Sequence, residues 1–314
     1  MEFGLLKKAA VYSACLCVAL TSCRSAKTGQ DMALSADPLG SLRASIASIA
    51  DSCPAEIGVA VITDNGDTLT LNNRNVYPMM SVFKLHQAIA VCEDLDRRGI
   101  PLDSLIRINR ADLDPDTWSP MLKEHDEPQF ELPVKDLLRY TLMQSDNNAS
   151  NLMFSEIAGV GQTDSLIATI IPRDAFRIVY TEREMARDHG KAYANRTTPL
   201  GAAQLIYSLY TDSLVSVDKQ EFLRNTLREC KTGNDRIVAP LLGKKGVVIG
   251  HKTGSGYTTP EGVLVAHNDV AYICLPDGRK YALAVFVKDC NGDEKRAAEA
   301  IARISEAVYD ALGI

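Results

Sequence analysis

The chain has 314 residues, of which 46% are hydrophobic and 24% charged, a composition ordinary for a globular protein of one large domain or two small ones. Its formal net charge is −6 at pH 7 and it contains no long run of Lys or Arg, so a nucleic-acid partner is excluded. The same composition excludes the disordered and fibrous classes of protein.

The first residues are typical of a bacterial export signal. Lys7 and Lys8 provide the positive start, and the apolar run that follows, 9–20, is too short to span a bilayer as a mature helix. We therefore expect residues 1–22 to be a signal peptide that directs the protein to the periplasm or cell envelope.

Cys23 ends a Leu-Thr-Ser-Cys sequence that resembles a lipobox, in which the cysteine is lipidated and becomes the first mature residue. We expect a lipid-anchored Cys23 and a flexible tether over 23–38, because that stretch is rich in Ser, Ala, Gly and Asp. The alternative is the small-residue end of an ordinary cleavable signal, without a lipid.

Beyond the tether, the hydrophobic pattern predicts elements in a clear order. Helical spacing predicts a helix over 39–50, and two β-branched runs, 56–63 and 68–73, flank turn residues and predict a hairpin. The middle of the chain is dominated by helical periodicity, with helices predicted at 81–96, 133–144, 149–158, 199–210 and 218–230. The chain closes with three predicted strands and an amphipathic helix, at 247–253, 269–275, 281–287 and 294–312.

Strands at both chain ends with helices between them predict an α+β fold, in which one antiparallel five-stranded sheet is built from both termini beside an all-helical lobe. We expect one domain over 39–314, with a sheet lobe formed by 39–75 and 240–314 and a helical lobe formed by 76–239. No internal repeat or low-complexity segment interrupts this arrangement.

Five of the eight cysteines follow the leader, namely Cys53, Cys92, Cys230, Cys274 and Cys290. Their spacing matches no zinc-binding pattern, and the five histidines are scattered along the chain. We therefore expect no metal or organic cofactor. The cysteines should be small buried hydrophobes, and an oxidising compartment would permit one or two disulfides, although an odd number cannot pair completely.

Ser81 and Lys84 are three residues apart at the start of a predicted helix, so one helical turn places the amine beside the hydroxyl. A serine becomes a nucleophile when a base takes its proton, and lysine can be that base in a desolvated pocket that lowers its pKa. The helix N-terminus would also favour negative charge on Ser81. The alternative is structural, an N-cap serine followed by a surface lysine.

Two further polar motifs follow. The Ser-Asp-Asn sequence at 145–147 lies between two predicted helices, on a turn, where the alternative is a plain helix cap. The Lys-Thr-Gly-Ser-Gly sequence at 252–256 closes a predicted strand, and its glycines would let a substrate approach the backbone, the alternative being a strand that ends in a glycine turn. The three motifs in this order predict serine acylation chemistry.

This trio resembles the signature of class A serine β-lactamases and penicillin-binding proteins. The resemblance covers residues 39–314, and the segments 77–84 and 145–154 are similar to the CfxA-type and PER-type cephalosporinase branch of class A. It implies the β-lactamase/DD-peptidase (transpeptidase-like) fold, whose active site lies in the cleft between the sheet and the helical lobe.

The resemblance implies a role for each residue of the first two motifs. Ser81 is the nucleophile and Lys84 its partner, while Ser145 relays a proton to the leaving β-lactam nitrogen. Asn147 binds the amide of the substrate side chain, and Asp146 holds the turn.

In the third motif, the resemblance assigns Lys252 and Thr253 to the substrate carboxylate. It assigns the backbone N–H groups of Ser255 and Ser81 to the oxyanion hole, which stabilises the charge that develops on the carbonyl oxygen.

Two residues outside the motifs also match family positions. Trp118 matches an aromatic wall of the cleft, with core packing as the alternative, and Arg236 matches an arginine that helps to bind the carboxylate in the PER-type branch. Where many class A enzymes carry that arginine on the sheet, this chain has Asn268.

The Glu-x-Glu-Met sequence at 182–185 resembles the omega-loop motif of class A enzymes, which implies that Glu182 activates the water for deacylation. The family pattern has Asn four residues after that Glu, but this chain has Ala186, so one ligand of the water is lost. Two alternatives stay open, namely Glu184 as the base, or a solvated acidic cluster without a catalytic role.

Together these features predict an exported, monomeric hydrolase that acts on small-molecule β-lactams, cephalosporins and penicillins, through a serine acyl-enzyme and so confers antibiotic resistance. The alternatives are a penicillin-binding DD-carboxypeptidase and a β-lactam-sensing domain that is acylated but barely turns over. Glu182 argues against the peptidase, and the sensor would need a transmembrane segment that the sequence does not display.

Overall fold

The computed structural model describes residues 38–312. The predicted signal peptide, Cys23 and the tether up to residue 37 lie outside the described residues. Within 38–312, no helix combines the length and the apolar character that a membrane crossing requires.

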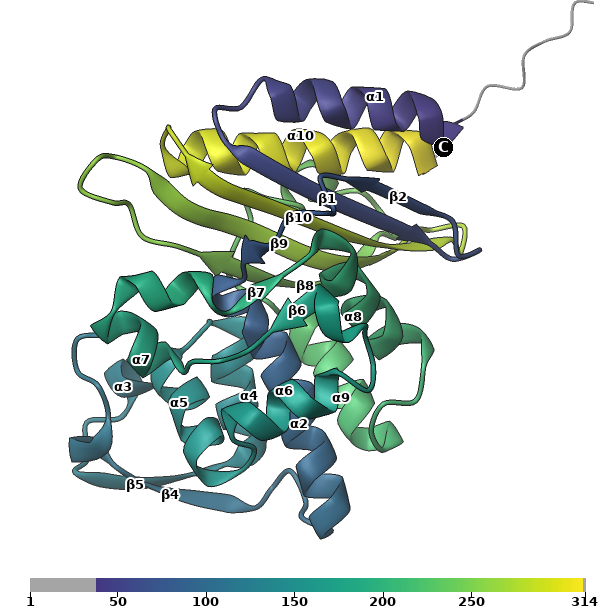
Figure 1. Cartoon of the computed structure of the whole chain (residues 1–314). Helices are drawn as coiled ribbons and strands as arrows, with labels where there is room; N and C mark the ends of the chain where they lie inside the picture. Colours follow the sequence, from purple (N-terminus) through teal and green to yellow (C-terminus); the bar gives the residue numbers. More distant parts are fainter. Residues whose placement is uncertain (1–37, 313–314) are drawn as a thin grey trace, which may run out of the picture. The chain divides into compact units, whose positions relative to one another are not determined.

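One antiparallel sheet of five strands organises the domain, in the spatial order β2-β1-β10-β9-β8 (Figure 1). Its strands are β1 (Glu56–Thr63), β2 (Thr68–Leu71), β8 (Val248–Ser255), β9 (Leu264–Cys274) and β10 (Lys280–Cys290). Strand β1 lies against β10, with register pairs from Glu56 and Lys288 to Thr63 and Tyr281. The predicted five-stranded sheet built from both chain ends is therefore confirmed.

Both faces of the sheet are covered. Helices α1 (Pro38–Asp51) and α10 (Glu294–Leu312) lie side by side on one face, and the helical lobe lies on the other (Figure 1). Val59 and Val61 of β1 pack with the first layer, whereas Ala60 and Ile62 pack with the second. Because alternate residues of a strand point to opposite faces, a strand buried on both sides is apolar along its length.

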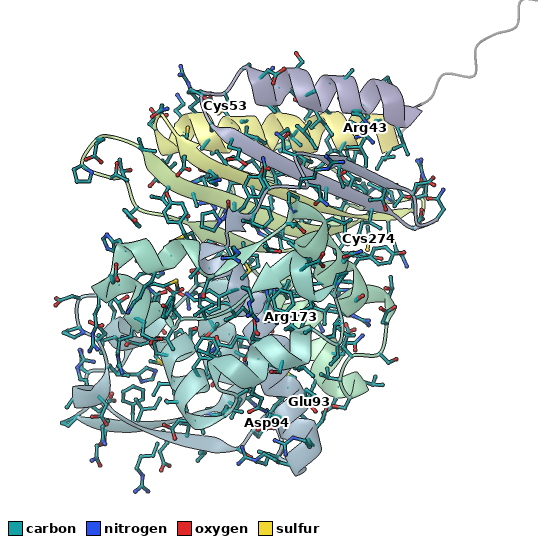
Figure 2. All side chains as sticks on the ribbon, in the orientation of Figure 1. Arg43, Cys53, Glu93, Asp94, Arg173 and Cys274 are labelled. Atoms are coloured by element: carbon teal, nitrogen blue, oxygen red, sulfur yellow. The ribbon has the colours of Figure 1, made fainter. Side chains whose placement is uncertain are left out.

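The helical lobe is built around α2 (Phe83–Arg98), most of whose residues are buried. Around it lie α3 (Pro120–Glu124), α4 (Val134–Met143), α5 (Asn147–Glu156), α6 (Val160–Ile167), α7 (Glu182–Arg187), α8 (Pro199–Thr211) and α9 (Val217–Arg228). Side chains fill the space between these helices and the sheet (Figure 2). Gly99 ends α2 with φ +64°, a left-handed conformation that glycine adopts without strain.

Several short elements were not predicted. Strands β3 (Tyr77–Pro78), β6 (Phe176–Arg177) and β7 (Arg196–Thr197) form a small sheet, and β4 (Leu105–Asn109) pairs with β5 (Gln129–Pro133). Short 3₁₀ turns add η1 (Met80–Val82), η2 (Arg110–Asp112), η3 (Arg173–Ala175), η4 (His189–Tyr193) and η5 (Ala239–Leu241). Helices α3, α6 and α7 were also missed. The two-residue strands, the short 3₁₀ turns and helices of five to eight residues carry too few hydrophobic repeats to show a period.

The cysteines of the described residues differ from one expectation. All five are free thiols, so the structure contains none of the disulfides that an oxidising compartment would permit. Three of them, Cys53, Cys92 and Cys290, are buried, in agreement with their predicted role as small hydrophobes. The other two, Cys230 and Cys274, are partly exposed.

Candidate active site

A cavity of about 410 Å³ lies between the edge strand β8 and the helical lobe. It is lined by residues of all three predicted motifs and of the 182–185 segment, including Ser81, Ser145, Asn147, Glu182, Thr253 and Ser255. The fold thus brings together polar residues that are up to 174 positions apart in the chain.

Ser81 lies in η1, immediately before α2 begins at Phe83. The preceding Met80 has φ +46°, a left-handed conformation that is strained for a residue with a long side chain. Buried neighbours on both sides hold this turn in place, because Met79 and Val82 are fully buried. The predicted nucleophile is therefore presented from a strained, tightly packed turn at the start of a helix.

Gly254 explains how β8 comes so close to this turn. A Cβ atom at Gly254 would lie 2.4 Å from the carbonyl oxygen of Met79 and 3.1 Å from the nitrogen of Val82. The sequence suggested that glycine here admits substrate to the backbone. In the structure, the glycine instead lets the strand itself pack against the segment that carries Ser81.

Lys84 is fully buried, and its amine is the centre of the polar network of the site. Its Nζ lies 3.0 Å from Ser81 Oγ and 3.0 Å from Glu182 Oε1. Further acceptors are the carbonyl oxygen of Ser145 at 2.8 Å and Asn147 Oδ1 at 2.6 Å. An ammonium has three protons to donate, so the network offers it more acceptors than it can use at once.

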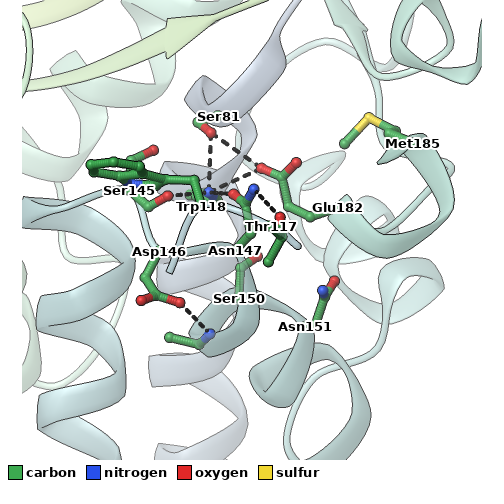
Figure 3. A network of polar contacts seen from close by, with 12 residues as sticks. Ser81, Thr117, Trp118, Ser145, Asp146, Asn147, Ser150, Asn151, Glu182 and Met185 are labelled. Atoms are coloured by element: carbon green, nitrogen blue, oxygen red, sulfur yellow. Dashed lines mark hydrogen bonds and ion pairs between the residues drawn. The ribbon is translucent and has the colours of Figure 1, made fainter. Parts of the chain in front are cut away.

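Glu182 closes a triangle with the serine and the lysine. The Ser81 hydroxyl donates to Glu182 Oε1 at 3.1 Å (Figure 3). Glu184 has a different task, because its Oε2 accepts from the backbone N–H of Thr181 and completes a capping box at the start of α7. Of the two candidate carboxylates, only Glu182 reaches the nucleophile. Ala186 also lines the cavity, with no polar side-chain atom to offer a water.

The Ser-Asp-Asn segment forms the turn between α4 and α5. Ser145 has φ +58°, and Asp146 holds the turn by accepting from the N–H of Ala149 at 2.9 Å and from that of Met121 at 2.7 Å. Asn147 donates from Nδ2 to Thr117 Oγ1 at 2.8 Å. The bonds of Asp146 are those of a helix cap, but the two flanking side chains point into the cavity (Figure 3).

Lys252 approaches the same turn from β8. Its Nζ lies 3.1 Å from Ser145 Oγ and 2.7 Å from the carbonyl oxygen of Thr253. The side chain is fully buried, and this burial lowers the pKa of Lys252 to about 7. The hydroxyl of Thr253 pairs with that of Thr232 at 2.6 Å. Lys252 therefore links the strand to the proposed proton relay.

Arg236 does not line the cavity. Its guanidinium donates to Ser255 Oγ at 2.6 Å, to the carbonyl of Asn268 at 2.7 Å and to that of Gly254 at 3.2 Å. Arg236 thus contacts Ser255, which does line the cavity, and orients the Ser255 hydroxyl. Asn268 has a separate role, because its Nδ2 donates to the carbonyl of Pro78 at 2.8 Å, in the segment before the nucleophile.

Trp118 lines the cavity, and 55% of its surface is exposed to solvent. Its indole N–H donates to the carbonyl of Gln144 at 2.8 Å, which fixes the ring beside the Ser-Asp-Asn turn (Figure 3). The alternative of core packing is wrong for this residue, because a core tryptophan would be buried.

Sequence reasoning missed two aromatic residues that line the cavity. His189 of η4 stacks on Tyr257, with ring centroids 4.1 Å apart, and both residues line the cavity. Neither belongs to a motif, and their 68-residue separation hides the contact from any local pattern. Thr232 was missed for the same reason. Cys23, the predicted lipidation site, lies outside the described residues.

Comparisons with known proteins identify the family of this chain. A model of the β-lactamase enzyme family matches residues 41–312. A β-lactamase of Phocaeicola vulgatus is 62% identical over 268 residues, which are 85% of this chain and 84% of that protein. The extended-spectrum β-lactamase PER-1 of Pseudomonas aeruginosa is 34% identical over 270 residues, which are 85% of this chain and 86% of that protein.

The fold is also similar to that of solved structures. The crystal structure of a class A β-lactamase from Bacteroides cellulosilyticus DSM 14838 has a TM-score of 0.83 and 32% sequence identity, and the match covers 88% of this chain and 98% of that chain. The chain belongs to the β-lactamase enzyme family, within class A.

Proposed function

We propose that this protein hydrolyses β-lactam antibiotics, cephalosporins and penicillins among them, through an acyl-enzyme on Ser81, and so confers resistance. The observation that carries the mechanism is the triangle in which Ser81 Oγ lies 3.1 Å from Glu182 Oε1 and 3.0 Å from Lys84 Nζ. A hydroxyl between a carboxylate and an amine can lose its proton as it attacks.

In the acylation step, Ser81 Oγ forms a bond to the lactam carbonyl carbon, and its proton passes to Glu182. The C–N bond of the ring then breaks. Ser145 Oγ, held 3.1 Å from the Lys252 amine, donates a proton to the leaving nitrogen and takes one back from Lys252. Glu182 then gives up the proton that came from Ser81 and Lys252 regains one, so Glu182 is again a carboxylate before water attacks. The product is an ester on Ser81 and a free ring nitrogen, so the β-lactam has been opened without loss of any atom.

In the deacylation step, a water attacks the ester carbonyl while Glu182 takes one of its protons. The ester C–O bond breaks, and the proton returns to Ser81 Oγ, which restores the enzyme. The acidic side chain needed for this second step distinguishes a hydrolase from a protein that is only acylated. The position of Glu182 in the cavity supports turnover over the DD-carboxypeptidase and sensor alternatives.

The test is steady-state hydrolysis of a chromogenic cephalosporin by the purified protein, with a penicillin as the second substrate. We expect many turnovers per enzyme molecule. A single burst equal to the enzyme concentration, followed by no further colour, would indicate a sensor. Cleavage of a D-Ala-D-Ala peptide in preference to either β-lactam would indicate a peptidase.

We also infer that the protein is exported to the cell envelope, anchored by a lipid on Cys23, and acts there as a monomer. The positive start and apolar run of residues 1–22 and the lipobox-like sequence support export and anchoring. Analytical ultracentrifugation of the purified protein tests the oligomeric state.

A further inference from the structure

Three ionisable side chains that hydrolysis does not use meet beside the site, at the edge of the sheet. Cys230 follows α9 and His251 lies in β8. Asp269 lies in the neighbouring strand β9, where it pairs in register with Thr253. His251 Nδ1 is 3.0 Å from Asp269 Oδ1, and Cys230 lies close enough to His251 for the charge of the imidazolium to favour the thiolate. A thiol, an imidazole and a carboxylate thus form a chain, and His251 and Asp269 are both buried.

This cluster is connected to the cavity through a pair of threonines. Cys230 Sγ lies 3.4 Å from Thr232 Oγ1, which in turn lies 2.6 Å from Thr253 Oγ1. Thr232 and Thr253 both line the cavity. A continuous path of side-chain contacts therefore runs from Cys230 to the hydroxyl that the family resemblance assigns to the substrate carboxylate.

The loop that carries Cys230 is fitted closely to β8. Gly233 has φ +74°, and a Cβ atom there would lie 2.4 Å from the methyl carbon of Thr253. The N–H of Lys231 donates to the carbonyl of Met143 at 2.8 Å, at the end of α4 and two residues before Ser145. These contacts hold the Cys230 loop between the Lys-Thr-Gly motif of β8 and the segment that leads to the Ser-Asp-Asn turn.

The charges in this region complement each other. Burial opposes the charged forms of both Cys230 and His251. The nearby carboxylate of Asp269 and the thiolate of Cys230 outweigh burial at His251 and raise its pKa to about 10. The imidazolium of His251 in turn lowers the pKa of Cys230 to about 7. Burial also lowers the pKa of Lys252 to about 7. The positive charges of Lys84 and Arg236 also lower the pKa of Lys252. The negative charges of Cys230 and Glu182 raise it, and the effect of Cys230 is the larger of these two.

We propose that Cys230, through its contacts with His251 and Thr232, is a positioning residue that prepares Thr253 and Lys252 for the substrate carboxylate. This inference rests on the proposed β-lactam hydrolysis. The thiolate orients the Thr232–Thr253 hydroxyl pair and balances the buried ammonium of Lys252. Cys230 itself contacts neither substrate nor the reacting atoms.

The test compares Cys230→Ser and Cys230→Asp with the wild type, using a cephalosporin and its methyl ester, which lacks the carboxylate. In Cys230→Ser the negative charge is lost while a hydroxyl remains. We expect KM for the acid to rise about tenfold, the effect of one weakened hydrogen bond to a charged group, with kcat nearly unchanged. The ester should show no such rise.

The pH profile gives a second readout that a purely structural role would not move. Without the negative charge of the thiolate, the pKa of the Lys252 ammonium falls. The decrease of kcat/KM at alkaline pH should therefore begin at lower pH in Cys230→Ser. Cys230→Asp restores a negative charge and should move both KM and the limb back toward the wild type. The matched control is Cys274→Ser, which changes another partly exposed thiol at the far end of β9 and should leave both quantities unaltered.

Thermal unfolding of each variant ensures that folded proteins are compared. Wild-type KM and an unshifted alkaline limb in folded Cys230→Ser would overturn the inference, even if Cys230→Asp does not fold. In that case wild-type hydrolysis would still support the proposed function. An absence of hydrolysis by the wild type itself would instead overturn the proposed function and, with it, this inference.

Discussion

The carboxylate of Glu182 accepts a hydrogen bond from the hydroxyl of Ser81 at 3.1 Å, although 101 positions separate the two residues in the chain. Glu184, two residues further on, turns back to Thr181 and caps its own helix. The short helix α7 thus carries one carboxylate that contacts Ser81 and one that caps the helix. A comparison of substitutions at the two residues therefore tests which of them is the general base.

Glu182→Gln should form the acyl-enzyme but release it slowly. The glutamine cannot accept a proton from water, and the loss of a general base typically slows a step by about 10²–10⁴-fold. Acylation should be less affected, because Lys84 Nζ also lies 3.0 Å from Ser81 Oγ, where an amine can serve as the base for that step. Mass spectrometry of the protein during turnover of a cephalosporin should show the accumulated adduct.

Glu184→Gln is the matched control for that experiment, since glutamine can also complete a capping box. It should turn over nearly as fast as the wild type. Accumulation of the adduct in Glu184→Gln and not in Glu182→Gln would show that the assignment of the two carboxylates is reversed. Ala186→Asn, which adds the amide found in the family pattern, should change the rate only slightly.

Ser81→Ala should abolish covalent labelling by a β-lactam, because the variant lacks the only atom proposed to form the ester. The fold should survive, since Lys84 and Glu182 still pair with each other at 3.0 Å. Intact-protein mass spectrometry measures the labelling, and circular dichroism measures the fold. Stoichiometric labelling of the folded variant would rule out Ser81 as the nucleophile.

Gly254→Ala should displace the nucleophile. The added carbon would lie 2.4 Å from the carbonyl oxygen of Met79, both being held in tightly packed backbone, so the turn that carries Ser81 must move. Such overpacking typically costs about 1–3 kcal/mol of folding stability. We expect a lower denaturation midpoint and a large loss of kcat/KM.

Gly161→Ala serves as the control for that substitution. Gly161 lies in α6, and a Cβ atom there would meet nothing within 4 Å. Alanine in a helix is favoured over glycine by roughly 0.5–1 kcal/mol, so this variant should be slightly more stable and fully active. If Gly254→Ala behaves in the same way, the close approach of β8 to the turn is not a requirement for activity.

Cys53 and Cys290 should form a disulfide under oxidising conditions. The two buried thiols lie close enough that Cys290 adds to the effect of burial in raising the pKa of Cys53, and the N–H of Asn291 donates to the carbonyl of Pro54 at 2.8 Å, which holds their segments together. Cys53 lies where α1 turns toward β1 (Figure 2). Oxidised glutathione would take two electrons and two protons from the pair, and the cross-link should stabilise the fold by about 2–4 kcal/mol.

The rate of this oxidation should depend on pH. Burial raises the pKa of Cys53 to about 11, so little of the reactive thiolate exists at neutral pH, and cross-linking should accelerate as the pH rises toward that value. Non-reducing peptide mapping measures the cross-link, with Cys53→Ala as the control. Detection of both thiols in reduced form after prolonged alkaline oxidation would contradict the prediction.

Cys23→Ala should change where the full-length protein is found. If Cys23 carries lipid, the wild type expressed with its leader should sediment with membranes, and the variant should appear in the soluble fraction or remain unprocessed. Mass spectrometry of the N-terminus identifies the modification. A soluble wild type whose unmodified N-terminus lies beyond residue 23 would show instead an ordinary cleaved signal.

The nucleophile and its class of chemistry could be read from the sequence because they depend on local spacing. Ser81 and Lys84 share one helical turn, and the order of the three motifs does not depend on how the chain folds between them. The five strands of the sheet were also predictable, since each is long enough to show its apolar, β-branched character.

Only the tertiary structure decided which partner each group meets. Glu182 and Glu184 look alike in the sequence, and folding alone sends one to Ser81 and the other to the helix cap. Arg236 was expected to reach substrate but stands behind Ser255, and the contacts of Cys230 join elements that no pattern connects. The physical reason is that hydrophobic periodicity specifies a segment and its buried face, whereas contacts between distant side chains arise only when all the segments pack together.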